Sequence, residues 1–215
     1  MTATDEAVLY GYFRSTAAYR VRIALGLKGL SAQHRFVHLR NGEQTQEAYR
    51  RINPAGLVPY WIDGDLHLAQ SLAIIEYLDE THPDPPLLPK GAQARAIARE
   101  MAQAVCCDIH PVGNLRVLNA LIELGVDDVA RAKWSQRWIE SGFDAIEVRL
   151  EPLPGPFAFG AQPTLADICI VPQVFNARRF GVDLEPYHRI REIDAAASKL
   201  EAFASAEPGR QPDAE

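Results

Sequence analysis

Hydroxyl and charged side chains stand at the point where a short apolar segment gives way to a helical one. Arg14, Ser15 and Thr16 follow the apolar residues 8–12 and precede residues 17–28, whose apolar positions repeat with helical spacing. A hydroxyl before a helix ordinarily caps its first N–H groups. A helix N-terminus also binds anions, and a thiolate is one of them. These residues therefore indicate either a simple cap or a site that stabilises a thiolate.

Two further features of this kind follow in the first part of the chain. Val58 precedes Pro59, which is either a proline of an edge strand or a cis-proline that turns the backbone of Val58 toward an extended peptide. Gln70 and Ser71 open a helical segment, so Ser71 either caps that helix or helps its N-terminus bind a carboxylate. The three features together are much more specific than any one of them.

The elements that position these residues alternate between strand and helix patterns. Residues 33–39 alternate polar and apolar side chains, as a half-buried strand does, and Asp63-Gly64-Asp65 predicts a hairpin. Gly29 predicts the end of the first helix. The predicted strands are 8–12, 33–39, 57–62 and 66–68, and the predicted helices are 17–28, 43–51 and 71–80. The order β-α-β-α-β-β-α predicts an α/β domain with a parallel pair and an antiparallel hairpin.

The second part of the chain has a helical pattern throughout. Prolines 83, 85, 86 and 89 break the chain before it and indicate a linker. One long, kinked helix is expected over residues 91–123 and another over 127–150. Thr164 and Asp167 form a capping-box signature ahead of an apolar run in which Pro172 predicts a kink or break. The expected domains are 1–82, a linker at 83–90 and an all-helical domain at 91–215.

Composition sets limits on the class of protein. The chain has 215 residues, of which 47% are hydrophobic, with a net charge of −6, which excludes a disordered chain and a general binder of nucleic acid. No apolar window is long enough for a membrane helix, and acidic residues near the N-terminus argue against a secretory signal. Cys106, Cys107 and Cys169 fit neither a disulfide framework nor a metal site, so a cytoplasmic protein with reduced thiols is expected.

At this level of detail the sequence resembles the zeta class of the glutathione transferases, the family of the maleylacetoacetate isomerases. The resemblance covers nearly the whole chain, from about residue 8 to the QPD at 211–213. It is carried by the segments 12–29 (YFRSTAAYRVRIALGLKG), 53–59 (NPAGLVP), 70–78 (QSLAIIEYL), 107–118 (CDIHPVGNLRVL) and 175–187 (FNARRFGVDLEPY). It implies a thioredoxin-like N-terminal domain, a C-terminal helical bundle and glutathione as cofactor.

The resemblance also assigns roles to individual residues. Ser15 matches the hydroxyl that stabilises the thiolate of glutathione, and Thr16 lies at the next hydroxyl position. Ala17 stands where many members carry a cysteine, so no catalytic protein thiol is expected. Residues that match glutathione-binding positions are Gln44, Val58, Pro59, Gln70 and Ser71, with Gln44 in the segment that departs most from the family pattern. Residues that match the pocket for an acidic substrate are Arg14, His110, Asn114 and Arg179, and Arg14 is also expected to take part in catalysis.

Some of these residues have simpler explanations. Arg178 and Arg179 fit two solvated helix charges, and because helix neighbours point about 100° apart, only one of them easily faces a pocket. His110 fits a buried histidine with satisfied hydrogen bonds. Tyr10 or Tyr12 could replace the serine by imitating the tyrosine of other transferase classes.

The activity implied by the resemblance is the glutathione-dependent cis–trans isomerisation of maleylacetoacetate to fumarylacetoacetate in tyrosine and phenylalanine breakdown. Reversible addition of a thiolate turns the double bond of this small dicarboxylic enedione into a single bond that can rotate. The alternatives are maleylpyruvate as substrate, a transferase acting on small alpha-halo acids, and a binding module without catalysis. A homodimer is implied, without a metal, a nucleic acid or a membrane as partner.

Overall fold

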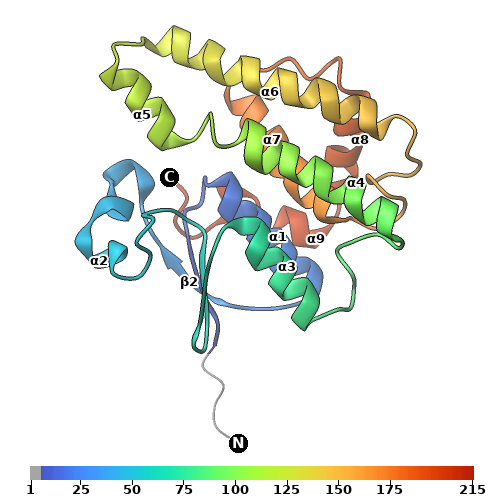
Figure 1. Cartoon of the computed structure of the whole chain (residues 1–215), viewed down its shortest axis with the longest axis horizontal. Helices are drawn as coiled ribbons and strands as arrows, with labels where there is room; N and C mark the ends of the chain where they lie inside the picture. Colours follow the sequence, from blue (N-terminus) through green and yellow to red (C-terminus); the bar gives the residue numbers. More distant parts are fainter. Residues whose placement is uncertain (1–5) are drawn as a thin grey trace, which may run out of the picture. The chain divides into compact units, whose positions relative to one another are not determined.

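The structure is a computed structural model that describes residues 6–215 (Figure 1). Residues 1–5 lie outside the described part. The start of the expected domain 1–82 and the prediction that the N-terminus is not a secretory signal both concern these residues. The contacts within the chain divide it into two compact units. The first contains the described residues up to Pro86 together with Leu200–Glu215, and the second is Leu87–Lys199.

A four-stranded mixed sheet forms the centre of the first unit. Its strands are β1 (Val8–Gly11), β2 (Gln33–Phe36), β3 (Tyr60–Asp63) and β4 (Leu66–Ala69), in the order β2-β1-β3-β4. β1 is parallel to β2 and antiparallel to β3, and β3 is antiparallel to β4. The predicted β-α-β unit and the hairpin are therefore confirmed.

Helices α1 (Thr16–Lys28) and α3 (Ser71–Thr81) pack against each other (Figure 1). α1 is buried almost all round, and Gly29 ends it with a φ of 64°, as the sequence predicts. Shorter helical segments join β2 to β3 and follow the second unit; they are η1 (Leu39–Asn41), η2 (Glu43–Thr45), α2 (Glu47–Arg50), α9 (Glu201–Ala204) and η4 (Pro208–Arg210).

Three local predictions in this unit are wrong. The single helix expected over 43–51 is divided into η2 and α2, because Gln46 between them is extended. The strand expected to be half-buried over 33–39 ends at Phe36, and all four residues of β2 are exposed. β2 lies at the edge of the sheet, so polar/apolar alternation there does not mark a buried face. Ser71 is not the N-cap of α3, because Gln70 takes that position with a φ of 73° and Ser71 is the first helical residue.

The second unit is helical throughout. It consists of α4 (Ala92–Gln103), the π-helix η3 (Ala104–Ile109), α5 (Leu115–Glu123), α6 (Asp128–Leu150), α7 (Leu165–Arg179) and α8 (His188–Ala197). The single helix expected over 91–123 is wrong, because α4 passes into the π-helix and the chain turns at Pro111 before α5 begins. The helix predicted over 127–150 is confirmed as α6.

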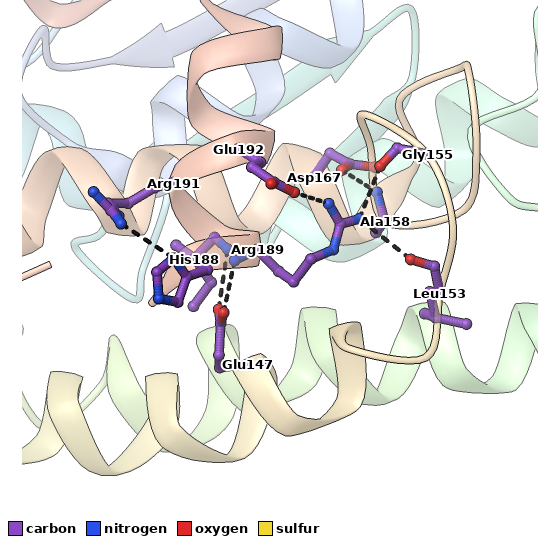
Figure 2. A network of polar contacts seen from close by, with 10 residues as sticks. Glu147, Leu153, Gly155, Ala158, Asp167, His188, Arg189, Arg191 and Glu192 are labelled. Carbon is purple, nitrogen blue, oxygen red and sulfur yellow. Dashed lines mark hydrogen bonds and ion pairs between the residues drawn. The ribbon is translucent and has the colours of Figure 1, made fainter. Parts of the chain in front are cut away.

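The predicted capping box begins α7, the most buried helix of the second unit. The carboxylate of Asp167 is fully buried and accepts hydrogen bonds from Thr164 N at 2.7 Å and Thr164 Oγ1 at 2.9 Å. It also accepts from Ala158 N at 2.8 Å (Figure 2). It therefore joins the helix start to the preceding loop. The break suggested by Pro172 does not occur, since α7 runs through it to Arg179.

Glu147 of α6 accepts hydrogen bonds at the start of α8, as Asp167 does at the start of α7. Its two carboxylate oxygens accept from the backbone N–H groups of Arg189 at 2.6 Å and Ile190 at 3.0 Å, in the first turn of α8 (Figure 2). Arg189 in turn donates to the carbonyls of Leu153 and Gly155, in the loop that leads to the capping box. The network joins α6, the loop and α8 through groups that would otherwise lack partners.

We expect Asp167→Asn to lower the free energy of unfolding by about 2–3 kcal/mol, because an amide cannot accept all three hydrogen bonds. Burial raises the pKa of Asp167 from 3.8 to about 6. The folded chain therefore holds this proton more tightly than the unfolded chain, and the resulting stability is complete below pH 3.8 and lost as pH rises through about 6. In urea unfolding, the difference between the parent chain and the variant should be about 1 kcal/mol larger near pH 5 than near pH 7. A difference that increases with pH would contradict this assignment.

The end of the chain departs from the expected domain division. Residues 200–215 were placed in the helical domain, but their contacts group them with the first unit. α9 packs on α1, and the red C-terminal end returns to the blue segments of the first unit in Figure 1. Among the described residues, no helix is long and apolar enough to cross a membrane.

Candidate functional site

Three predicted site segments meet at one end of the sheet. Tyr10 near the end of β1 pairs with Tyr60 at the start of β3, and Tyr60 pairs with Ala69 at the end of β4. The segments that leave the sheet beside these residues carry the predicted site residues Ser15, Val58, Pro59, Gln70 and Ser71. The fold of the first unit therefore brings these segments together.

Ser15 is the N-cap of α1. Its Oγ accepts a hydrogen bond from Ala18 N at 3.2 Å, so the cap predicted from the sequence is present. A hydroxyl has two lone pairs and one proton, and the cap uses only a lone pair. In the described part of the chain, the Ser15 proton has no acceptor. The cap therefore orients the hydroxyl at the positive end of α1 and leaves its proton available for an anion.

The two residues that follow Ser15 are less accessible than Ser15 itself. Thr16 is the first residue of α1 and is buried, and Ala17 is also buried. Arg14 is partly exposed, with its guanidinium carbon 5.8 Å from the centre of the Phe13 ring. Tyr12 is buried, and burial raises the pKa of its phenol, although Arg14 opposes the increase. Among the two hydroxyls at the start of α1, Ser15 is thus the better placed to meet a ligand.

The segment before β3 presents backbone groups. The Val58–Pro59 peptide bond is cis. Within residues 6–215, neither the N–H nor the C=O of Val58 has a hydrogen-bond partner. The preceding carbonyl of Leu57 is held by Tyr49 Oη at 2.7 Å and Asn53 Nδ2 at 2.8 Å. The segment is thus fixed, and the backbone of Val58 can pair with an extended peptide.

Gln44 lies next to this segment. Gly56 has a φ of 62°, and a Cβ built there would come within 2.8 Å of the Gln44 carbonyl oxygen. A side chain at position 56 would therefore push the two segments apart. The close approach brings Gln44 to the loop that carries Val58, as a shared binding site requires.

The N-terminus of α3 forms a second candidate anion site. Its first N–H groups have no intrahelical partner, its first turn holds no acidic residue, and Gln70 makes no side-chain cap. Beneath it, Arg20 of α1 is only 1% exposed and donates from Nη1 to Ser71 Oγ at 3.3 Å. Nε and Nη2 of Arg20 have no partner among the described residues. A buried cation without a paired carboxylate favours an anion at this helix end.

Two predicted residues of the second unit lie on either side of a turn. His110 follows the π-helix, and Asn114 is the N-cap of α5, with Oδ1 accepting from Arg116 N at 3.2 Å. His110 Nε2 and Asn114 Nδ2 are 3.4 Å apart. Trp134 of α6 holds the turn by donating to the Val112 carbonyl at 2.8 Å. The structure therefore brings these two polar side chains together on a fixed turn.

The paired arginines at the end of α7 differ in their surroundings. Arg178 donates from Nη2 to Asp194 Oδ2 of α8 at 2.5 Å. The guanidinium of Arg179 lies over the ring of Phe180, with its carbon 4.5 Å from the ring centre. The ion pair thus joins Arg178 to α8, and the role of Arg179 in binding an anion stays a prediction.

Comparison with known proteins settles the family. Residues 9–86 match the glutathione S-transferase N-terminal domain, and residues 128–204 match the glutathione S-transferase C-terminal domain. A protein of Vibrio cholerae named "Probable maleylacetoacetate isomerase" is 47% identical, over 96% of this chain and 98% of that protein. The chain belongs to the glutathione S-transferase family. The predicted thioredoxin-like domain with a helical C-terminal domain is thereby confirmed.

Two solved structures show to which class of glutathione transferases the chain is similar. Maleyl pyruvate isomerase, described as a bacterial glutathione S-transferase of the zeta class, matches with a TM-score of 0.95 and 46% identity, over 97% of this chain and 100% of that one. Maleylacetoacetate isomerase of Methylobacterium extorquens AM1, with bound malonate and glutathione, matches with a TM-score of 0.93 and 40% identity, over 97% and 99% of the two chains. The predicted zeta-class membership is confirmed.

Sequence reasoning missed Arg20. It treated α1 as an amphipathic helix and gave no role to its charged residues. The available signal was that Arg20 and Arg22 lie in an apolar helix with no acidic residue to pair with either. A charge that no neighbour along the helix can neutralise must find its partner elsewhere in the fold, or in a ligand.

Proposed function

We propose that this chain is a glutathione-dependent cis–trans isomerase that converts maleylacetoacetate to fumarylacetoacetate. The observation that carries the proposal is the Ser15 hydroxyl, which the cap of α1 orients while its proton stays available. The names and the full-length similarity of the relatives support it. Maleylpyruvate is the second candidate substrate, favoured by the similarity to maleyl pyruvate isomerase.

The residues present fit glutathione as cofactor. Its cysteinyl backbone needs an N–H and a C=O from an extended partner, which Val58 offers. Its γ-glutamyl carboxylate needs a positive site, which the N-terminus of α3 offers above the buried Arg20. Gln44, Pro59 and Gln70 complete the set that we assign to binding. When bound, glutathione supplies the thiolate nucleophile that makes rotation about the double bond possible.

The protein's part is to keep that sulfur ionised and within reach. A free thiol has a pKa of about 8.5, and lowering it by two units requires about 2.7 kcal/mol. A hydrogen bond from Ser15 to a charged group contributes about 1.5–3 kcal/mol. The N-terminus of α1 adds about 0.3–1 kcal/mol. Together these terms are large enough without a general base, with Thr16 as a further hydroxyl at the helix start.

The substrate carries negative charge in its carboxylates, and more develops on its ketone oxygen during the reaction. We assign Arg14 to stabilise the developing charge and Arg179 to bind a carboxylate, since a guanidinium can hold a carboxylate with two hydrogen bonds. His110 and Asn114 supply further polar contacts from their turn. The malonate bound to the Methylobacterium relative, a small dicarboxylate, supports a substrate of this class.

We expect Arg179→Ala to raise the KM for the enedione about tenfold while the KM for glutathione changes less than twofold, because a charge-assisted hydrogen bond is lost on the substrate side only. The matched control is Arg178→Ala, which removes the adjacent guanidinium and an exposed ion pair of small energetic value. Steady-state kinetics with each reactant varied in turn measure both constants. Equal effects of the two variants, or equal effects on both constants, would reject the role of Arg179.

The direct test is loss of the enedione absorbance of maleylacetoacetate and of maleylpyruvate, each with and without glutathione. Turnover that requires glutathione supports the proposal, and the ratio of the two kcat/KM values identifies the substrate. Turnover of neither, with release of halide from small alpha-halo acids instead, would make the chain a conjugating transferase. Binding of glutathione without any turnover would make it a binding module.

We also infer a homodimer in the cytoplasm, where the pathway of aromatic amino-acid breakdown would use this activity. Within the described residues the three cysteines form no disulfide, which fits a reducing compartment. The homodimer stays a prediction from the family resemblance, and light scattering of the purified chain tests it.

A further inference from the structure

The C-terminal segment, residues 205–215, reaches the turn that carries Ser15. We propose that Asp213 in this segment is a positioning residue for thiolate stabilisation, because it holds the turn between β1 and α1 in place. This inference rests on the proposed role of Ser15 and names a residue that acts through it. Three observations carry it: the form of the turn, the partners of Phe13, and the other anchors of the segment.

The turn spans residues 12–15. It is closed by a hydrogen bond from Ser15 N to the Tyr12 carbonyl at 3.0 Å, and the Ser15 carbonyl then accepts from Tyr19 N at 2.8 Å to begin α1. Phe13 and Arg14 are the two central residues. Neither the Phe13 N–H nor the Phe13 carbonyl takes part in the turn's own hydrogen bond, so both can be held by contacts from elsewhere.

Both backbone polar groups of Phe13 are held by other parts of the fold. Phe13 N donates to Asp213 Oδ2 at 2.8 Å, across 200 positions of the sequence. The Phe13 carbonyl accepts from Arg22 Nη2 at 3.0 Å. Phe13 is buried, so these two partners replace water that a loop would ordinarily use. The position of Ser15, two residues further on, is therefore set by Asp213 and Arg22.

Arg22 also ties the C-terminal segment to the turn. Its Nε donates to the Ala206 carbonyl at 3.0 Å while its Nη2 holds Phe13. Burial lowers the pKa of Arg22 to about 10, and the nearby carboxylate of Asp213 opposes that decrease. The guanidinium of Arg22 and the carboxylate of Asp213 thus hold the carbonyl and the N–H of Phe13, respectively. The two charges also attract each other.

The end of the chain has a second anchor. The carboxylate of Glu215 pairs with His38 and also lies 3.4 Å from Arg40. Gln211 donates from Nε2 to the carbonyls of Ser205 and Glu207 at 2.8 and 2.9 Å, which folds the segment back on itself. Asp213 lies between these anchors, so its carboxylate is presented to Phe13 by a fixed backbone.

The test compares Asp213→Ala and Asp213→Asn with Glu207→Ala, which removes an exposed carboxylate of the same segment. The first measurement needs no glutathione: hydrogen exchange of the Phe13 amide in the folded protein. We expect exchange to become at least tenfold faster in Asp213→Ala, intermediate in Asp213→Asn, whose amide oxygen can still accept, and unchanged in Glu207→Ala. The second measurement is the thiol pKa of bound glutathione from thiolate ultraviolet absorbance.

We expect the fraction of bound thiolate at neutral pH to fall severalfold in Asp213→Ala and to stay unchanged in Glu207→Ala. A merely structural role would leave that fraction unchanged in the molecules that remain folded. Unchanged exchange and an unchanged thiolate fraction in either folded Asp213 variant would overturn the inference. If the parent chain itself fails to ionise glutathione, the proposed function is wrong, whereas the exchange measurement still decides whether Asp213 holds the turn.

Discussion

Ser15→Ala should lower kcat/KM for the isomerisation by roughly 10- to 100-fold, which corresponds to the loss of one hydrogen bond to a charged group. The Ser15 hydroxyl is held by the Ala18 N–H at the positive end of α1, and its proton is the group that we assign to the sulfur. The thiol pKa of bound glutathione should rise by about one to two units in the variant. Turnover against pH and thiolate absorbance measure the two effects independently.

Loss of the helix cap must be separated from loss of the donor. Ser15→Gly keeps most of the cap stability, whereas Ser15→Ala loses about 1 kcal/mol, yet both lack the hydroxyl. We expect the two variants to differ in thermal stability and to be equally impaired in activity. Ser15→Thr restores a hydroxyl and should recover part of the rate. Near-parental turnover of Ser15→Gly would end the assignment of the thiolate to Ser15.

Arg20→Met should have opposite effects on stability and on binding. Arg20 is buried, donates only to Ser71 Oγ, and has two nitrogens without partners among the described residues. Replacing such a cation with an apolar side chain of similar length removes an unneutralised buried charge, so the free energy of unfolding should stay the same or increase. The Kd for glutathione should rise by about tenfold or more, because the positive site at α3 is weakened.

The origin of the effect can be checked with a glutathione analogue that lacks the γ-glutamyl carboxylate. The parent chain should bind the analogue about as weakly as Arg20→Met does, and the variant should lose little more on the same change. Calorimetric titration of both ligands with both proteins completes this cycle. If Arg20→Met unfolds more easily and the ratio of its Kd values for the two ligands equals that of the parent chain, Arg20 stabilises only the core and does not bind the carboxylate.

The sequence was sufficient wherever the deciding interaction is local. The hairpin at Asp63-Gly64-Asp65, the end of α1 at Gly29 and the box of Thr164 and Asp167 each depend on residues a few positions apart, and each was predicted. The burial of β2 depends on its place at the sheet edge, which its alternation does not reveal. The π-helix before His110 likewise depends on packing against α6, where a Cβ on Gly142 would meet Ile109 Cδ1 within 2.2 Å.

The candidate site divides in the same way. Ser15, Val58 and Ser71 could be named from the sequence because each stands at the end of an element and because the family pattern covers them. The partners that hold them could not. Asp213 reaches Phe13 across 200 positions. Arg20 of α1 contacts Ser71 of α3. No repeat or spacing in the sequence predicts either contact.

The first unit consists of two segments that are far apart in the sequence, so its parts are synthesised at different times. Domains generally form from the N-terminus while the chain is still being made. Here the sheet and α1 can assemble early, but Asp213 and Glu215 reach Phe13 and His38 only after the whole helical unit has been translated. A nascent chain that lacks residues 213–215 therefore carries Ser15 on a turn that Asp213 does not yet hold.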